Sequence, residues 1–88
     1  MTSFNSILLF KVQNQFVITG HGLILTPGLG DNVKYVSIGT KIKLIKPDKS
    51  EVITTILGIT FEGNNDILIS SEFSKTDIPI GTEVWTHE

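Results

Sequence analysis

Several chemistries are excluded by residues that this chain does not contain. It has no cysteine, so no disulfide, thiolate nucleophile or cysteine-based metal site is available, and core burial alone must hold the fold. It also has no arginine, because all seven basic residues are lysine. Bidentate recognition of phosphate depends on the guanidinium fork, whereas lysine supplies only a point charge. With a net charge of −2, the composition argues against a strongly basic nucleic-acid binder.

Long apolar runs are missing too. The longest uninterrupted one, Ile7 to Phe10, is four residues, whereas a membrane-spanning helix needs roughly 20. No basic segment followed by an apolar stretch of about 7–15 residues marks a secretory signal, so the cytoplasm is the expected location. The 88 residues, 40% of them hydrophobic, are enough for one core. We therefore predict a single domain over residues 1–88.

Short strand-like segments separated by turn residues fill the chain. Alternation puts Leu8, Phe10 and Val12 on one face of a strand over residues 7–13, and Ile42 and Leu44 on one face of a strand over 41–46. No segment holds a 3.6-residue apolar pattern long enough for an ordinary helix. Further strands are expected over residues 16–19, 23–26, 33–36, 51–61, 67–70 and 83–86.

The segment 51–61 is longer than the usual strand of about five or six residues, so Gly58 is predicted to mark a bulge or bend within it. Alternation makes Ile53, Thr55, Leu57, Ile59 and Phe61 its best common face.

Turn residues divide these segments. Pro27–Asn32 is expected to be a loop and Pro47–Ser50 a β-turn. The segments Ser37–Thr40 and Pro79–Thr82 share Ile-Gly-Thr, and each precedes a strand. The simplest interpretation is one turn conformation used twice. Gly20-His21-Gly22 interrupts strand-like sequence, and we interpret it as a corner that bends the sheet into a barrel.

These motifs resemble the second, β-barrel domain of the translational GTPases, the family of elongation factor Tu. The resemblance covers roughly residues 10–86 and implies a small closed or partly open antiparallel Greek-key barrel of six to seven strands. No Gly-x-x-x-x-Gly-Lys-Ser/Thr loop occurs, so this chain is not expected to be a GTPase by itself. The matching elements are Phe16-x-Ile18-x-Gly20-x-Gly22, Ile38-Gly39, Gly58 with Phe61, and Ile80-Gly81.

Members of that family typically carry arginine between the two motif glycines, on a barrel that helps to hold the aminoacyl end of tRNA. This chain has His21 there. The resemblance therefore implies RNA or tRNA as an alternative partner, contacted by His21 and by the lysines of segment 34–49; a solvated strand face explains the same lysines equally simply. The candidate contact residues are His21, Lys34, Lys41, Lys43, Lys46, Lys49 and Trp85.

Two of these candidates have a second interpretation. His21 either contacts a ligand near neutral pH or is simply exposed. Trp85 either stacks on a base or a partner, or packs at the rim of the core. His87, two residues from Trp85, is expected to be frayed.

No catalytic, cofactor or metal site is predicted. A nucleophile, base and orienting group cannot be picked out, Gly-x-Ser-x-Gly is absent, and no second metal ligand stands near His21. We therefore expect a non-enzymatic binding or adaptor module that meets another protein through a barrel face or the Pro27–Asn32 loop. RNA is the alternative partner, and a small hydrolytic enzyme is the third possibility. No membrane partner is expected, and the oligomeric state is predicted to be a monomer or a weak homodimer.

Overall fold

The computed structural model describes residues 6–60 and 63–87 and contains eight strands and one 3-10 helix within them. The prediction of an all-β protein is confirmed, with more strands than the six or seven expected. No helix in this part of the chain is long and apolar enough to cross a membrane. The strands are β1 (Leu8–Lys11), β2 (Asn14–Ile18), β3 (Gly22–Thr26), β4 (Lys41–Ile45), β5 (Glu51–Thr55), β6 (Gly58–Ile59), β7 (Ile67–Ile69) and β8 (Glu83–Thr86), and the helix is η1 (Gly30–Tyr35).

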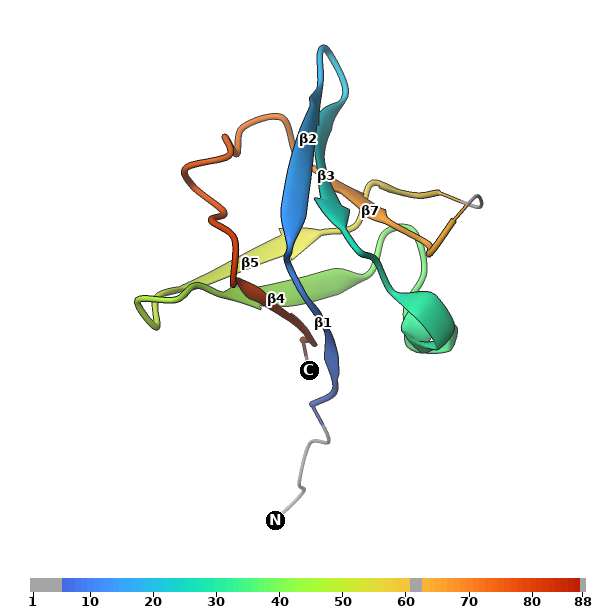
Figure 1. Ribbon diagram of the computed structural model, residues 1–88. Helices are drawn as coiled ribbons and strands as arrows, with labels where there is room; N and C mark the ends of the chain where they lie inside the picture. Colours follow the sequence, from blue (N-terminus) through green and yellow to red (C-terminus); the bar gives the residue numbers. More distant parts are fainter. Residues whose placement is uncertain (1–5, 61–62, 88) are drawn as a thin grey trace.

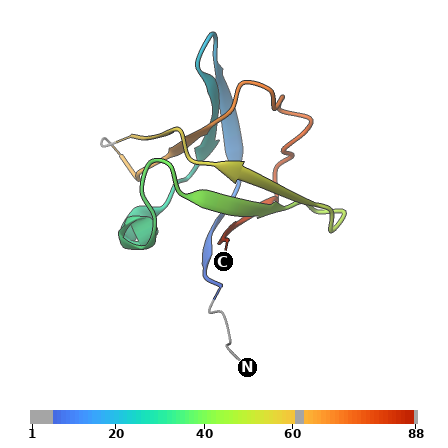
Figure 2. The same ribbon diagram turned by 180° about the vertical axis from the view of Figure 1, so that it is seen from behind.

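The strands form two four-stranded sheets in which every pair is antiparallel. One sheet has the order β1-β8-β4-β5 and the other β2-β3-β7-β6. The hairpin of β4 and β5 runs across the direction of β2 and β3 (Figure 1), and the reverse view shows the same crossing (Figure 2). Over residues 6–60 and 63–87, no strand ladder joins the two sheets into a closed barrel.

The chain changes sheets four times, and two of these passages are two-residue corners: Val12–Gln13 after β1 and Ile56–Leu57 after β5. At the first corner, the backbone N–H of Val12 donates to the carbonyl of Thr82, beside β8, and that of Gln13 donates to the carbonyl of Thr26 in β3. Consecutive residues therefore bond to different sheets. Strands that switch sheets through a bend are the usual way in which crossed sheets are connected.

The second corner divides the predicted strand 51–61 into β5 and β6, which accounts for the additional strand. The predicted bend near Gly58 is confirmed. The predicted common face is wrong, because Ile53 and Leu57 are 45% and 47% exposed while Ile56 is fully buried. Phe61 lies outside the described residues.

A β-bulge changes the inward face of β1. The pairing with β8 shifts between Leu8 and Phe10, so Leu9 turns inward as well as Phe10. Leu8, predicted to share the inner face with Phe10 and Val12, is 42% exposed instead. An extra residue in one strand reverses the alternation on one side of it.

Residues 33–36 are not a strand, because most of them belong to η1. Leu29, only 2% exposed, anchors the segment in the core, and the backbone N–H of Asn32 bonds to its carbonyl. The Asn32 side chain also donates to the carbonyl of Leu9. These contacts hold the segment as a tight turn against the end of β1.

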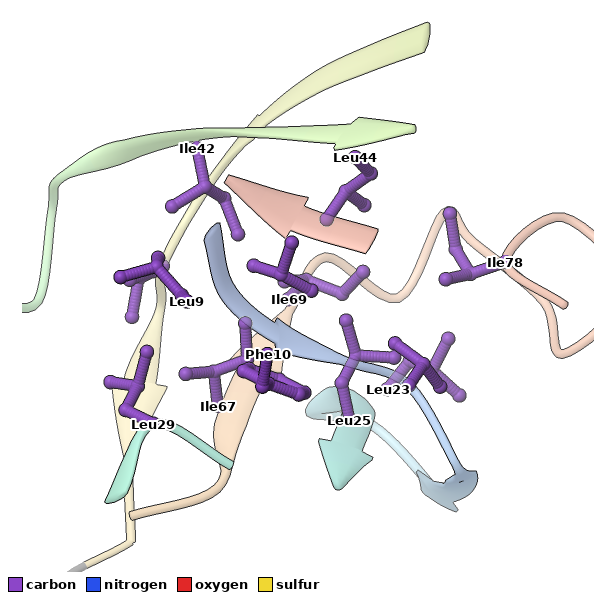
Figure 3. Close-up of a cluster of buried hydrophobic side chains, with 13 residues drawn as sticks. Leu9, Phe10, Leu23, Leu25, Leu29, Ile42, Leu44, Ile67, Ile69 and Ile78 are labelled. Carbon is purple, nitrogen blue, oxygen red and sulfur yellow. The ribbon is translucent and has the colours of Figure 1, made fainter. Parts of the chain in front are cut away.

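The core lies between the two sheets (Figure 3). Ile42 and Leu44 of β4 point into it, as the alternation predicted. Gln15, a buried polar residue of β2, donates its side-chain amide to the carbonyls of Lys75 and Ile78 and so ties the loop before β8 to the second sheet. The buried apolar residues are Leu9, Phe10, Val12, Leu23, Leu25, Leu29, Ile42, Leu44, Ile56, Ile67, Ile69, Ile78 and Val84.

The two Ile-Gly-Thr segments do adopt one turn conformation. The N–H of Thr40 bonds to Ser37 at 3.0 Å and that of Thr82 bonds to Pro79 at 3.1 Å. The glycines between them have φ of 95° and 97°, and glycine is the residue that enters this region without steric cost. The shared sequence therefore encodes a local turn rather than a structural repeat.

Gly20-His21-Gly22 is the turn of the β2–β3 hairpin and not a corner between sheets. The N–H of His21 bonds to the carbonyl of Ile18 at 2.9 Å, and Gly20 has φ of 80°. The hairpin projects beyond the rest of the molecule (Figure 1).

Candidate functional site

The candidate contact residues from the sequence lie in four separate places. His21 is exposed at the tip of the β2–β3 hairpin, and Lys34 lies in η1 with its ammonium 5.3 Å from the centroid of the Tyr35 ring. Lys41 and Lys43 lie in β4 and Trp85 lies in β8 of the same sheet. Lys46 and Lys49 lie in the turn between β4 and β5. No single surface can use all seven predicted contacts.

Three of these residues share the outer face of the β1-β8-β4-β5 sheet. Lys43 is directly opposite Trp85 of β8, and Lys41 lies on the same side of β4 two residues away. Directly opposite residues of an antiparallel pair lie on the same face of the sheet. Leu8 and Ile53, both more than 40% exposed, flank this pair on the neighbouring strands.

The polar groups on this face are partly engaged with one another. The Trp85 indole N–H donates to Glu83 Oε1 at 2.9 Å, and Lys43 Nζ lies 3.9 Å from Glu51 Oε1. Trp85 is partly buried, as expected for rim packing. The face therefore combines one aromatic ring with two lysines, of which Lys43 has a carboxylate close to its ammonium group.

The middle of the Pro27–Asn32 loop is held against the rest of the molecule, while Asp31 is exposed. Gly28 and Leu29 are buried, and a Cβ atom added to Gly28 would lie 2.4 Å from the carbonyl oxygen of Asn64. The N–H groups of Leu29 and Gly30 bond to the backbone of Asn65 and Asn64. The loop packs against the turn before β7, so its turn residues have a structural explanation.

The surface that sequence reasoning missed is on β2. Phe16, Val17 and Ile18 are 48%, 59% and 42% exposed, although alternation alone suggests that one side of the strand is buried. β2 is the end strand of its sheet and pairs with β3 only. We call these three residues the β2 edge patch.

A signal for this patch was present in the sequence. No Asp, Glu, Lys or Arg occurs between Lys11 and Asp31. Edge strands are usually protected from pairing by charged residues, proline or bulges. β2 has none of these, and its register with β3 is continuous over all five residue pairs.

The β4–β5 turn has its own electrostatic features. Hydrogen bonds from the Ser50 hydroxyl and backbone N–H, with a further contribution from nearby Lys46, lower the pKa of Asp48 below its ordinary value. In the loop before β8, hydrogen bonds from Ser74 lower the pKa of Asp77 in the same way. Both carboxylates are exposed, so they stabilise local turns rather than a reactive centre.

Within the described ranges, no group of three His, Asp or Glu residues could hold a metal ion. Burial raises the pKa of the Asp66 carboxyl. The backbone of Asp66 belongs to the turn before β7, where its N–H donates to the Thr60 hydroxyl and its carbonyl accepts from the Thr60 N–H.

Comparison with known proteins found no matching family model, no matching curated protein and no matching solved structure. The resemblance to the second domain of the translational GTPases therefore stays a prediction.

Proposed function

We propose that this protein is a non-enzymatic binding module that adds an extended segment of another protein alongside β2. The observation that carries this proposal is the β2 edge patch, three consecutive exposed apolar side chains on an unprotected end strand. Such a strand offers unpaired backbone groups to a partner, and pockets around alternate side chains supply specificity.

The size of the patch favours strand addition over a purely apolar contact. Each side chain is about half exposed, so covering the remainder contributes about 1 kcal/mol per residue, or about 3 kcal/mol in all. A micromolar complex requires about 8 kcal/mol. Main-chain hydrogen bonds along β2 and contacts with residues next to it must supply the remaining binding free energy, as they do when a peptide joins a sheet edge.

The partner segment should carry apolar side chains on both of its faces. Phe16 and Ile18 project from one face of β2, and Val17 projects from the other. An extended segment lying beside β2 would meet Phe16 and Ile18 with one set of its side chains and Val17 with the other.

A charge placed on this edge tests the proposal. Val17→Lys introduces the residue that most often protects natural edge strands, at a position that is 59% exposed and leaves the core intact. The matched control is Ile53→Lys, at a 45% exposed position of β5, the end strand of the other sheet.

Affinity capture with the tagged protein, after nuclease treatment, should retain a partner with the parent chain and with Ile53→Lys and lose it with Val17→Lys. Retention of the same partner by all three would place its contact elsewhere and overturn the β2 assignment.

The alternative function, RNA binding, is supported by one observation, the common face of Trp85, Lys43 and Lys41. Trp85 is the single tryptophan of the chain, so its fluorescence reports directly on stacking with a base. We expect quenching by single-stranded RNA at low salt that fades as salt rises, if this face binds RNA. Unchanged fluorescence at high micromolar RNA would exclude this function.

We also propose that the two crossed sheets form a partly open barrel of the kind found in the second domain of translational GTPases. Support comes from the corners Val12–Gln13 and Ile56–Leu57, which carry the chain and its hydrogen bonds from one sheet to the other. An experimentally determined structure in which β1 and β2 belong to unconnected layers would contradict this assignment.

A further inference from the structure

A pocket of about 320 Å³ lies where β1, the β4–β5 turn and the turn before β8 meet. Three lysines line it: Lys11 from β1, and Lys46 and Lys49 from the turn. Ile45 and Ile80 provide apolar walls, and Ile80 is 60% exposed. The volume is at the lower end of the range of about 300–1,000 Å³ found for small-molecule sites.

None of the three lysines forms an ion pair with another residue in the part of the chain that the structure describes. The one ion pair there joins Lys43 and Glu51. Glu83 also lines the pocket, but its Oε1 accepts the hydrogen bond from the Trp85 indole. The Glu83 carboxylate keeps its negative charge, because the indole that bonds to it is neutral. The pocket lining therefore carries three positive charges and one negative charge, and this excess of positive charge favours an anion.

Two more carboxylates lie near Lys46, and both are held by serines. Asp48 accepts hydrogen bonds from the N–H and hydroxyl of Ser50, and Asp77 accepts one from the N–H of Ser74. Neither lies within ion-pair distance of a lysine in the described ranges. They reduce the positive potential over the turn without occupying the pocket.

The backbone of Lys49 has an unusual conformation. Its φ is 76°, in the left-handed region that lysine rarely adopts. The turn places it there because its N–H bonds to Lys46 at 2.8 Å and the N–H of Lys46 bonds to Ser50 at 2.8 Å. Glycine is the residue that normally fills this position of a hairpin loop. The turn therefore fixes the backbone of one of the three lysines that line the pocket.

From these observations we propose that the pocket binds a small phosphate monoester. Its dianionic phosphate lies among Lys11, Lys46 and Lys49, and its organic part lies against Ile45 and Ile80. This site is separate from the β2 edge patch, and neither proposal depends on the other. Because lysine binds phosphate as a point charge and no arginine is present, affinity should be modest and should fall with salt.

Titration with inorganic phosphate and with phenyl phosphate, followed by amide NMR at low salt, tests the proposal. We expect saturable shifts at Lys11, Lys46 and Gly81 with both, and binding of phenyl phosphate that is several-fold tighter because its ring covers the isoleucines. Phenol, which lacks the anion, should cause no saturable shift. Absence of saturation by about 20 mM of either phosphate would overturn the proposal, because binding that weak is not a site.

Two variants separate loss of the site from loss of the fold. Lys46→Gln with Lys49→Gly removes two cations, and glycine suits the φ of 76° at position 49. This double variant should remain folded and bind phenyl phosphate at least about tenfold more weakly, a change of about 1.4 kcal/mol. Lys34→Gln with Lys41→Gln also removes two positive charges, from outside the pocket, and is the control for net charge that should bind normally.

Equal weakening in the double variant and in the control would show a general charge effect and refute the site. A single-stranded RNA oligonucleotide that shifts the pocket residues while both small phosphates do not would also refute it, and would assign the lysines to a polymer backbone instead.

Discussion

The Gly-x-Gly element of the β2–β3 hairpin offers a sharp test of the structure, because its two glycines are required for different reasons. Gly20 has φ of 80°, and a Cβ atom added there meets nothing within 4 Å. Gly22 has φ of 150°, and a Cβ atom there would lie 2.0 Å from the carbonyl oxygen of Ile69 in β7. Gly20→Ala therefore costs backbone strain alone, whereas Gly22→Ala also drives β3 away from β7.

The expected loss of stability in each variant follows from these contacts. For Gly20→Ala, strain of about 1–2 kcal/mol in the left-handed region is offset in part by the stiffer unfolded chain, which leaves about 1 kcal/mol of destabilisation. For Gly22→Ala, similar strain adds to about two weakened ladder hydrogen bonds of about 1 kcal/mol each and to disturbed packing of about 1–3 kcal/mol around Leu23 and Ile69. The total is about 4 kcal/mol or more, close to the entire stability of a small domain.

Urea denaturation followed by circular dichroism, with linear extrapolation, measures both free energies. In thermal melts, Gly20→Ala should lower Tm by about 4–8 °C, and Gly22→Ala should lower it several times as far or prevent folding. If Gly22→Ala is within about 1 kcal/mol of Gly20→Ala, then the close approach of β3 to β7 is wrong and with it the sheet order β2-β3-β7-β6.

Three further predictions concern the core and the surface charges. Leu25→Ala, at a fully buried position of β3, should lower the free energy of unfolding by about 2–5 kcal/mol in urea melts, and a loss below about 1 kcal/mol would contradict its place in the core. Ser50 holds the pKa of Asp48 below 3.8, so the carboxylate contributes stability that is present above that pH and is lost as pH falls through the lowered pKa. The free energy of unfolding should therefore decrease less steeply with falling pH in Asp48→Asn than in the parent chain, and parallel plots of this free energy against pH would refute the reasoning. A double-mutant cycle on the partly exposed pair Lys43 and Glu51 should give a coupling energy below about 1 kcal/mol, and a larger one would show that the pair is less solvated than its exposure indicates.

Local sequence signals predicted several elements correctly. Alternation identified the buried face of β4, and proline and glycine identified the turn Pro47–Ser50 and the two Ile-Gly-Thr turns. These features depend on residues close together in the chain, whose propensities act without distant partners.

Most of the errors arose where a distant segment decides the outcome. The bulge at Leu9 exists because β1 pairs with β8, and η1 replaces a strand because Leu29 reaches the core beside the end of β1. Segment 51–61 is divided because its second half pairs with β7 of the other sheet. Alternation within a strand carries no information about where the chain changes sheets or which strand lies at an edge.

For the candidate surfaces too, the sequence shows which residues are present and the fold decides which of them lie together. Segment 34–49 holds most of the lysines in one stretch of sequence, yet folding separates Lys34 from the outer face that carries Lys43 and brings Lys11 from β1 to the pocket with Lys46. The apolar pattern of Phe16 and Ile18 suggests burial, and only the position of β2 at the end of its sheet leaves them exposed.

By itself, the sequence determined the all-β class, most of the turns and the absence of cysteine and arginine chemistry, because these follow from residue type and short-range pattern. The tertiary structure alone decided where the chain changes sheets, which strand lies unprotected at an edge and which lysines share a pocket. Those outcomes depend on strand pairings between residues far apart in the chain, for which the free energy comes from burying a common core.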